Sequence, residues 1–289
     1  MQSRTSATTQ AIVIRDITEL AEMRELENLQ REVWGVEDID VLPALAIRPQ
    51  VEVGAILIGA FSNNEVVGFV FGFPGIVSGQ TIIHSDMLAV KPQFRRFGLG
   101  YLLKLAQRER AIEQGISCIT WTYDPLQLRN ANLNFARLGV TSKRYMIDFY
   151  GETTSFLHSF GTDRLWVEWL LNSDRVKDRI DSNAKPPLTS VELEQIPALV
   201  RVGEDEQPVV TEEVGLGTSA LIEIPADINS LVSRDDGSAQ RWRKATRQAF
   251  TKLMTSGFEV EEFFVVEKDS KTLGAYLLTK PFINASEPE

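Results

Sequence analysis

The first half of the chain alternates between helical and extended hydrophobic patterns. Apolar side chains recur at helical spacing over residues 18–34, and residues 43–51 predict a second, shorter helix. Two apolar runs, 55–61 and 66–73, are joined by Ser-Asn-Asn-Glu, in which the asparagines tolerate turn conformations. These two runs therefore predict a β-hairpin.

The run 81–90 is apolar along most of its length, which favours a central strand covered on both faces. A helix ending at Gly115 follows it, and its predicted buried face consists of Leu99, Leu102, Leu103 and Ala106. A strand, a helix and a strand are predicted next, over 116–123, 128–138 and 142–150. With a first strand at 11–15, this order is typical of an α+β domain in which helices flank a mixed sheet.

The pattern changes after Gly151. A predicted strand at 165–171 is followed by Ser-Asn-Ala-Lys-Pro-Pro at 182–187, which is typical of a linker. A strand, a helix and two more strands are predicted beyond it, over 220–224, 238–255, 258–266 and 273–279. We therefore predict three segments: a domain at 1–152, a connecting segment at 153–188 and a smaller C-terminal α/β module at 189–289. A role as a substrate lid is one hypothesis for the module.

Composition narrows the classes of function. The 289 residues carry a formal net charge of -10, with an isoelectric point near 4.9, which argues against nucleic-acid or anionic-membrane binding. The apolar runs are too short to span a membrane, and residues 1–10 lack the apolar stretch of a secretory signal. Cys118 is the only cysteine, which excludes an internal disulfide and favours the reducing cytoplasm. We expect a cytoplasmic protein without a metal.

Residues 91–110 depart from this acidic balance, with six basic residues against one acidic residue. Within them, residues 95–100 form a basic turn between the strand at 81–90 and the following helix. Gly98 and Gly100 let the backbone approach a ligand closely, and the first amides of a helix have no acceptors within it. Such a turn predicts a site for a pyrophosphate.

Two common phosphate motifs do not fit this turn. A dinucleotide fingerprint needs a third glycine where Leu103 stands, and a P-loop needs Gly-Lys-Ser/Thr, which is absent. An ordinary strand-turn-helix, in which the glycines only shape the turn, is the remaining alternative. What fits is Arg95-Arg96-Phe97-Gly98-Leu99-Gly100 after Leu88-Ala89-Val90. This run resembles the acyl-CoA site of the GCN5-related N-acetyltransferase (GNAT) superfamily, and the order of elements from 11 to 150 resembles that fold.

The resemblance implies an acyl-CoA, such as acetyl-CoA, as co-substrate. In that fold the turn amides hold the CoA pyrophosphate, and the pantetheine lies like an extra strand along the central strand. The residues matching these roles are Leu88, Ala89, Val90, Arg95, Arg96, Phe97, Gly98, Leu99 and Gly100. On the helix at 128–138, Asn130, Asn134 and Arg137 share the side opposite the apolar face, so that Asn130 or Asn134 is a candidate partner of CoA. A merely solvated face is the alternative.

A narrower resemblance rests on short motifs spread over both halves, among them His84-Ser85-Asp86-Met87-Leu88, Trp121-Thr122-Tyr123-Asp124-Pro125-Leu126 and Trp242-Arg243. They are similar to a GNAT subgroup of CoA-dependent N-acyltransferases, some linked with N-succinylamino-acid metabolism. This resemblance implies a small amine as acceptor. Many such relatives have no assigned substrate.

Amide formation from a thioester calls for a general base that deprotonates the amine and for release of the CoA thiolate as leaving group. Asp86 and His84 are the candidate bases; two positions apart, they are predicted to share a strand face with Leu88 and Val90. A buried acceptor and a core histidine are the alternatives. The superfamily's usual thiolate-protonating tyrosine corresponds to Phe135, which cannot donate, so Asn130 is a further catalytic candidate.

Acceptor recognition has a second set of candidates. Arg243 and Arg247, one helical turn apart, can clamp a carboxylate, and Tyr123 and Asp124 follow the motif strand. The alternative is a solvated basic face. Trp242 and Cys118 are predicted to be core residues.

The sequence thus predicts an N-acyltransferase that moves an acetyl or succinyl-type group from CoA directly to a small primary amine, with an amino acid as one candidate. A non-catalytic acyl-CoA-binding regulatory protein is the main alternative, motivated by Phe135. An interaction scaffold that retains only the fold is a third. The oligomeric state stays open, with a homodimer among the alternatives.

Overall fold

The computed structural model describes residues 11–151, 155, 159–181, 188, 190–211, 217–268 and 271–281. The chain divides into two compact units, one of residues 1–119 with 154–156 and one of residues 120–153 with 157–289. Compactness thus divides the chain at a different place from the predicted boundaries at 152 and 188, which stay predictions. The predicted linker at 182–187 and the N-terminal segment 1–10 lie outside the described residues.

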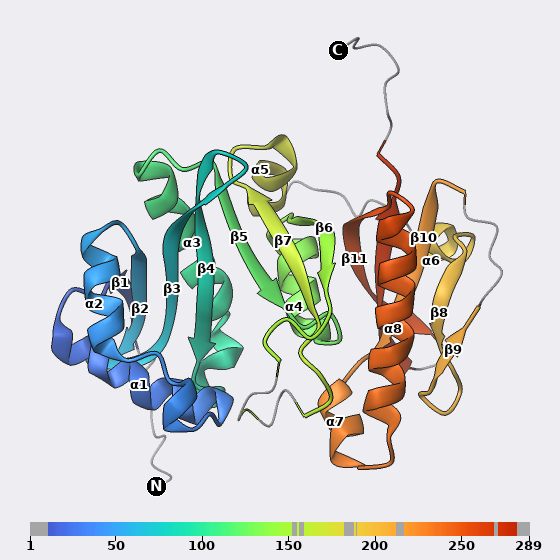
Figure 1. Cartoon of the computed structure of the whole chain (residues 1–289), viewed down its shortest axis with the longest axis horizontal. Helices are drawn as coiled ribbons and strands as arrows, with labels where there is room; N and C mark the ends of the chain where they lie inside the picture. Colours follow the sequence, from blue (N-terminus) through green and yellow to red (C-terminus); the bar gives the residue numbers. More distant parts are fainter. Residues whose placement is uncertain are drawn as a thin grey trace, which may run out of the picture. The chain divides into compact units, whose positions relative to one another are not determined.

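The first unit is built on an antiparallel sheet (Figure 1). Its strands, in the order in which they pair, are β1 (Ile12–Asp16), β2 (Ile56–Ser62), β3 (Glu65–Val77) and β4 (Gln80–Val90). Asn63 and Asn64 join β2 to β3 with φ angles of 49° and 65°, a left-handed conformation that asparagine tolerates. The predicted hairpin is confirmed.

Helices lie on both faces of this sheet (Figure 1). One face carries the two predicted helices, α1 (Leu20–Trp34) and α2 (Ala44–Glu52), and the short η1 (Asp38–Asp40), which was not predicted. Their apolar residues pack with β3 and β4 in one core, which includes Met23, Leu26, Ile47, Phe69 and Met87. The other face carries η2 (Pro92–Phe97) and α3 (Leu99–Glu113).

The buried face of α3 differs from the predicted one. Its buried residues are Leu99, Leu103, Lys104, Gln107 and Ala111. Leu102 is 42% exposed and lines a surface hollow with Ile14 and Ile58. Lys104, rather than Leu102, points at the sheet, where it donates a hydrogen bond to Ser85 of β4. The buried face of α3 is therefore rotated about the helix axis from the predicted face.

The second unit contains the remaining strands. In sequence they are β5 (Cys118–Tyr123), which begins just before the unit, β6 (Thr141–Met146), β7 (Arg164–Leu170), β8 (Ala198–Val202), β9 (Pro208–Val210), β10 (Ser219–Pro225), β11 (Glu259–Lys268) and β12 (Lys271–Thr279). They pair in the order β5-β7-β6-β11-β12-β10-β8-β9. Because β10 pairs with β8 in parallel and with β12 antiparallel, the sheet is mixed, which confirms the predicted fold class.

The C-terminal strands continue the sheet of residues 120–153. Val260 of β11 pairs with Ser142 of β6. The helices of this unit are α4 (Leu128–Ala131), the π-helical η3 (Asn132–Arg137), α5 (Asp174–Ile180), α6 (Ser190–Glu194), α7 (Ile228–Ser233) and α8 (Ser238–Thr255). Trp242, Phe250 and Leu253 of α8 are fully buried, and so Trp242 is a core residue, as predicted.

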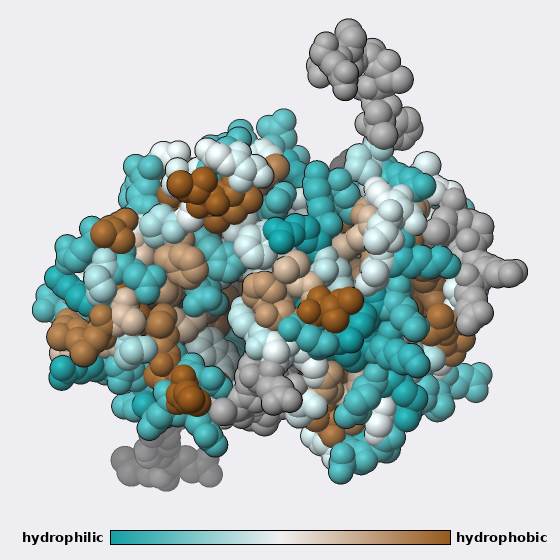
Figure 2. All heavy atoms as spheres, in the orientation of Figure 1, coloured by the Kyte–Doolittle hydropathy of each residue, from teal (hydrophilic) through white to brown (hydrophobic). Residues whose placement is uncertain are grey.

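Hydrophilic residues dominate the surface seen in Figure 2, with separate hydrophobic patches among them. Cys118 is buried, which confirms its predicted place in the core. None of the helices in the described ranges is long and apolar enough to cross a membrane.

Candidate functional site

The basic turn between β4 and α3 has the backbone predicted for it. Lys91 follows β4, η2 carries the two arginines, and Gly98 comes next with a φ of 67° that favours glycine. The Gly98 amide donates to the carbonyl of Arg95 (3.4 Å), and Arg95 Nε donates to the carbonyl of Val90 (3.3 Å). These bonds close the turn on itself and leave its outer surface to solvent.

The amides at the start of α3 are directed away from the helix's own bonds. The Gly98 carbonyl accepts from Tyr101 N (3.0 Å) and Leu102 N (3.2 Å), so the amides of Leu99 and Gly100 precede the first bonds of α3. Arg95, Arg96 and Gly98 are exposed beside them. The chemistry of this turn fits a phosphate group, which two amides, a helix N-terminus and two guanidinium groups can neutralise.

The two glycines of the turn differ in what they require. A Cβ added at Gly98 would meet no atom within 4 Å, whereas one at Gly100 would lie 3.8 Å from Leu88 Cδ2, an ordinary contact. Gly98 is therefore needed for its left-handed backbone and open surface, and Gly100 tolerates a methyl group.

A β-bulge interrupts β4 ahead of the turn. Phe71 pairs with Met87 and Phe73 pairs with His84, so that Ser85 and Asp86 both lie opposite Gly72. An extra residue in one strand shifts the alternation of its side chains by one position.

This bulge corrects the expectation that His84 shares a strand face with Leu88. The His84 ring lies 5.6 Å from the ring of Phe73, which packs on the core under α1 and α2. Leu88 instead faces α3, next to Gly100. His84 and Leu88 thus lie on opposite sides of the sheet.

The two candidate bases differ in their electrostatics. Burial lowers the pKa of the His84 imidazole to about 4, and the charge of Lys104 acts in the same direction. Asp86 keeps an exposed surface, but the protein around it removes enough water to raise the pKa of its carboxyl. The shift brings the pKa of the Asp86 carboxyl nearer to that of an efficient general base, and it takes the pKa of the His84 imidazole further away.

The predicted helix at 128–138 contains a π-helical segment. Leu138 N donates to the carbonyl of Leu133 (3.0 Å), five residues earlier. The wider turn changes which residues share a side: Asn130 is exposed, whereas Asn134 is only 4% exposed. The common polar face predicted for Asn130, Asn134 and Arg137 is therefore not formed.

Phe135, at the position of the superfamily's tyrosine, is fully enclosed. Its ring meets that of Tyr276 edge to face at 5.9 Å and lies 6.4 Å from that of Tyr123. Phe135 thus packs in an aromatic cluster of the second unit.

Tyr123 belongs to the same cluster. The Tyr276 hydroxyl donates to the carbonyl of Pro125 (2.7 Å), so the Tyr123 hydroxyl, 2.9 Å away, donates to Tyr276. Burial raises the pKa of the Tyr123 phenol well above its usual range. The hydroxyl predicted to touch substrate is engaged in linking β5 to β12.

Asp124 and Arg243 form a buried ion pair. Arg243 Nη2 donates to Asp124 Oδ2 (2.7 Å), and the guanidinium carbon lies 4.7 Å from the centre of the Phe160 ring. Arg243 is 4% exposed, and its Nε and Nη1 have no hydrogen-bond partner in the part of the chain that the structure describes. Donors in this position suit an oxygen-bearing ligand group.

Arg247 is engaged differently. Its Nε and Nη2 donate to the two carboxylate oxygens of Asp163 (2.8 and 2.6 Å), and Nη2 also reaches Asp148 (2.9 Å). Burial alone would raise the pKa of Asp163, but hydrogen bonds from Arg247 and Tyr145 hold it below its usual range. Arg243 and Arg247 therefore do not form the predicted carboxylate clamp, because the guanidinium of Arg247 is already bound to Asp163.

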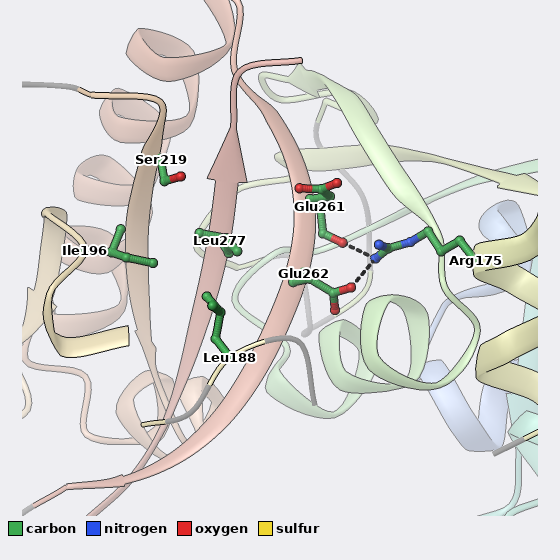
Figure 3. Close-up of a pocket in the computed structure, with 7 residues that line it drawn as sticks. All are labelled: Arg175, Leu188, Ile196, Ser219, Glu261, Glu262 and Leu277. Carbon is green, nitrogen blue, oxygen red and sulfur yellow. Dashed lines mark hydrogen bonds and ion pairs between the residues drawn. The ribbon is translucent and has the colours of Figure 1, made fainter. Parts of the chain in front are cut away.

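Two surface hollows contain none of the predicted site residues. One, of about 330 Å³, is lined by Leu188, Ile196, Leu277, Ser219, Glu261, Glu262 and Arg175 (Figure 3). Its carboxylate Glu262 is neutralised by Arg175 (2.7 Å) and by Arg179. The other is the hollow beside Leu102. In the described ranges, no three His, Cys, Asp or Glu side chains are placed to hold a metal ion.

Comparison with known proteins bears on the basic turn between β4 and α3. Residues 20–140 match the family model described as the acetyltransferase (GNAT) family, a range that includes β4, the basic turn and α3. The match covers less than half of the chain, and within it this segment is similar to GNAT acetyltransferases. Enzymes of this family bind acyl-CoA and an acceptor substrate, and they transfer the acyl group to the acceptor. Comparison with the curated proteins gave no match.

Solved structures of acetyltransferases are similar to the chain at low identity. An aminoglycoside 6'-acetyltransferase type Ii is 17% identical over 56% of this chain and 98% of its own, with a TM-score of 0.45. The ribosomal-protein-S18-alanine N-acetyltransferase from Escherichia coli is 12% identical over 62% and 99%, with a TM-score of 0.45. A GNAT-family acetyltransferase from Streptococcus pneumoniae is 18% identical over 55% and 98%, with a TM-score of 0.44.

The matched segment, residues 20–140, contains every predicted site residue except Arg243 and Arg247. Two residues were not predicted from the sequence. They are Lys104, whose amino group donates to Ser85 in the β4 bulge, and Asp163, whose carboxylate binds the guanidinium of Arg247. The position of Lys104 next to Leu103, on the apolar side of the predicted helix, is the sequence feature that could have indicated its burial. No local pattern distinguishes Asp163 from a surface acid, because its partners come from distant parts of the chain.

Proposed function

We propose that the protein is a cytoplasmic N-acyltransferase that moves an acetyl or succinyl-type group from CoA directly to a small primary amine. The observation that carries this proposal is the turn at Gly98, with two helix amides and two exposed arginines around an open backbone. The similarity to GNAT acetyltransferases supports CoA as the donor. The succinyl alternative rests on the subgroup resemblance alone.

In the proposed reaction the amine nitrogen attacks the thioester carbonyl. A C–N bond forms, the C–S bond breaks, and CoA leaves as the thiolate. The proton that the amine loses passes to Asp86, which we assign as the general base because it keeps an exposed surface, whereas the His84 imidazole packs against Phe73. A thiol with a pKa of about 8.5 leaves near neutral pH without a dedicated acid.

We further assign the acceptor a carboxylate, as in an amino acid. The reason is the guanidinium of Arg243, two of whose nitrogens have no partner in the described part of the chain; because both are buried, the carboxylate reaches them only when the side chains around them move aside. A carboxylate supplies two charged acceptors for such donors. Arg247 is left out of this contact, since its guanidinium is bound to Asp163.

One observation favours the alternative of a non-catalytic acyl-CoA-binding regulatory protein. Phe135 lacks a hydroxyl and is enclosed by aromatic side chains. In that case CoA binds, but no acyl group is transferred.

Thermal unfolding with CoA, acetyl-CoA and succinyl-CoA tests the binding half of the proposal. At a ligand concentration 100 times the dissociation constant, we expect a stabilisation of about 2.7 kcal/mol. Gly98→Asp and Gly98→Asn both tolerate the left-handed backbone and differ by one charge, so Gly98→Asp should lose more of the shift. Gly100→Ala is the matched control and should keep it. No shift with any CoA species would refute the proposal.

Thiol release from acetyl-CoA and succinyl-CoA, measured over a panel of amino acids, tests the transfer half. Each amino acid is paired with its carboxamide, which keeps the amine and lacks the carboxylate. We expect release with the amino acid and at least about tenfold less with the carboxamide. A thermal shift without release from any amine would favour the regulatory protein. Equal release from both members of each pair would overturn the assignment of Arg243.

A further inference from the structure

Lys104 lies directly behind the bulge of β4. Its amino group, reaching across from α3, bonds to Ser85 Oγ (2.7 Å) and donates to Gln107 Oε1 (3.2 Å). Ser85 is the first of the two residues that lie opposite Gly72. The lysine therefore bonds to the irregular part of the strand and not to its regular ladder.

The place of Lys104 is unusual for a lysine. It is 2% exposed, whereas Leu102, two residues earlier on the same helix, is 42% exposed. Burial of an amino group opposes folding, and here it lowers the pKa of Lys104 well below its usual range. A helix that hides an amine and exposes a leucine gives up stability at this position, which is common where a residue serves function.

The packing around the bulge is close. A Cβ added at Gly72 would lie 2.8 Å from Gln107 Nε2 and 2.9 Å from the carbonyl oxygen of His84. Lys104 and Gln107 thus back the bulge from the α3 side, and Gly72 closes it from β3. The neighbouring residue in the bulge is Asp86, the assigned base.

We propose that Lys104 is a positioning residue for acyl transfer: by holding Ser85, it fixes the bulge and thereby the direction of the Asp86 carboxylate. This inference rests on the function proposed above. Lys104 does not touch the reacting atoms. Its effect passes through one hydrogen bond and the backbone of two adjacent residues, and a displacement of about 1 Å in a base lowers a rate by up to about a hundredfold.

Two single variants and their combination test the proposal. Lys104→Met keeps the length of the side chain and removes the donor, and Ser85→Ala removes the partner while Lys104 stays. We expect each to lower kcat at least about tenfold, with the KM for acetyl-CoA changed less than about twofold. The double variant should lose no more than the larger single loss, since both changes break the same link. The acceptor in these assays is the amine that gives the fastest thiol release in the amino-acid panel described above.

A second measurement is independent of turnover. Hydrogen exchange of backbone amides over residues 82–90 of the free protein should become faster in both single variants, with amides of α1 unchanged. Leu103→Val is the matched control, because it shortens the neighbouring buried side chain of α3 without touching Ser85. It should lower the melting temperature and leave kcat unchanged.

The outcomes separate the two proposals. Absence of thiol release in the unaltered protein refutes the proposed function, and exchange then still reports whether Lys104 fixes the bulge. An active protein in which Lys104→Met keeps its kcat overturns this inference alone. Losses of kcat that multiply in the double variant, or a matching loss in Leu103→Val, would also overturn it, because they indicate a general effect of stability. Should Lys104→Met not fold, Ser85→Ala decides.

Discussion

Arg243 of α8 donates a hydrogen bond of 2.7 Å to Asp124, the residue that follows β5. The pair is buried, with 4% of Arg243 and 9% of Asp124 exposed. The second carboxylate oxygen of Asp124 accepts from the amide of Leu126 (2.9 Å). Arg243 therefore joins α8 to the turn after β5 through a charge that has almost no access to water.

Replacement of Arg243 by methionine should destabilise the protein strongly. The substitution leaves the Asp124 carboxylate buried without its guanidinium, and the free energy of unfolding should fall by about 3–5 kcal/mol. Urea unfolding measures the loss. Adding Asp124→Asn to Arg243→Met removes the stranded charge and should recover part of it; a double variant no more stable than the single one would show that the two residues are not coupled.

Replacement of Asp86 by asparagine tests the assigned base. The amide keeps the size of the side chain and cannot take a proton, so kcat/KM at neutral pH should fall by about a hundredfold or more. The thermal shift with CoA should be unchanged, because the turn at Gly98, to which we assign the pyrophosphate, lies beyond the end of β4. His84→Asn, measured beside it, should change kcat/KM much less. An Asp86→Asn enzyme with full activity would move the base elsewhere.

Local patterns predicted the elements well, and the turn best of all. The hairpin at Asn63 and the left-handed Gly98 depend on the conformational tolerance of single residues, which the sequence states directly. The β-bulge opposite Gly72 has no such signal, since it arises from the pairing of two strands. For that reason the faces of His84 and Leu88 were predicted wrongly.

Long-range partners explain the other differences. Periodicity on α3 favoured Leu102 over Lys104, because a hydrophobic pattern does not register an amine that finds its acceptor on another strand. Helical spacing also grouped Arg243 with Arg247, whereas Asp163, far along the chain, engages only the second. Strands β8 and β9 and helices α5, α6 and α7 were not predicted, since each is short and its pattern weak.

Restoring the superfamily's tyrosine at Phe135 should not restore an acid. The ring of Phe135 is fully buried against Tyr276 and Tyr123, so Phe135→Tyr adds a hydroxyl to an aromatic cluster. We expect the free energy of unfolding to fall by about 1–3 kcal/mol and kcat not to rise. Urea unfolding and thiol release measure the two effects. A higher kcat in Phe135→Tyr would indicate that the thiolate lies within reach of this position.

The buried imidazole of His84 should make stability depend on pH in a defined window. Burial lowers its pKa to about 4 in the folded protein, against an ordinary value of 6.5. The unfolded chain therefore binds a proton between pH 6.5 and 4 that the folded protein does not, and the free energy of unfolding falls as the pH is lowered through this window. The contribution is on the order of 3 kcal/mol and does not grow further below pH 4.

The variant His84→Asn isolates this effect, because every other titrating group is retained. Urea unfolding of both proteins at several pH values should show a difference in stability that shifts in favour of the variant as the pH falls from 6.5 to 4. At pH 7 and above the difference should be constant. Parallel curves through the whole range would mean that His84 titrates alike in the folded and unfolded chain, and the imidazole would then be charged beside Phe73 at pH 5.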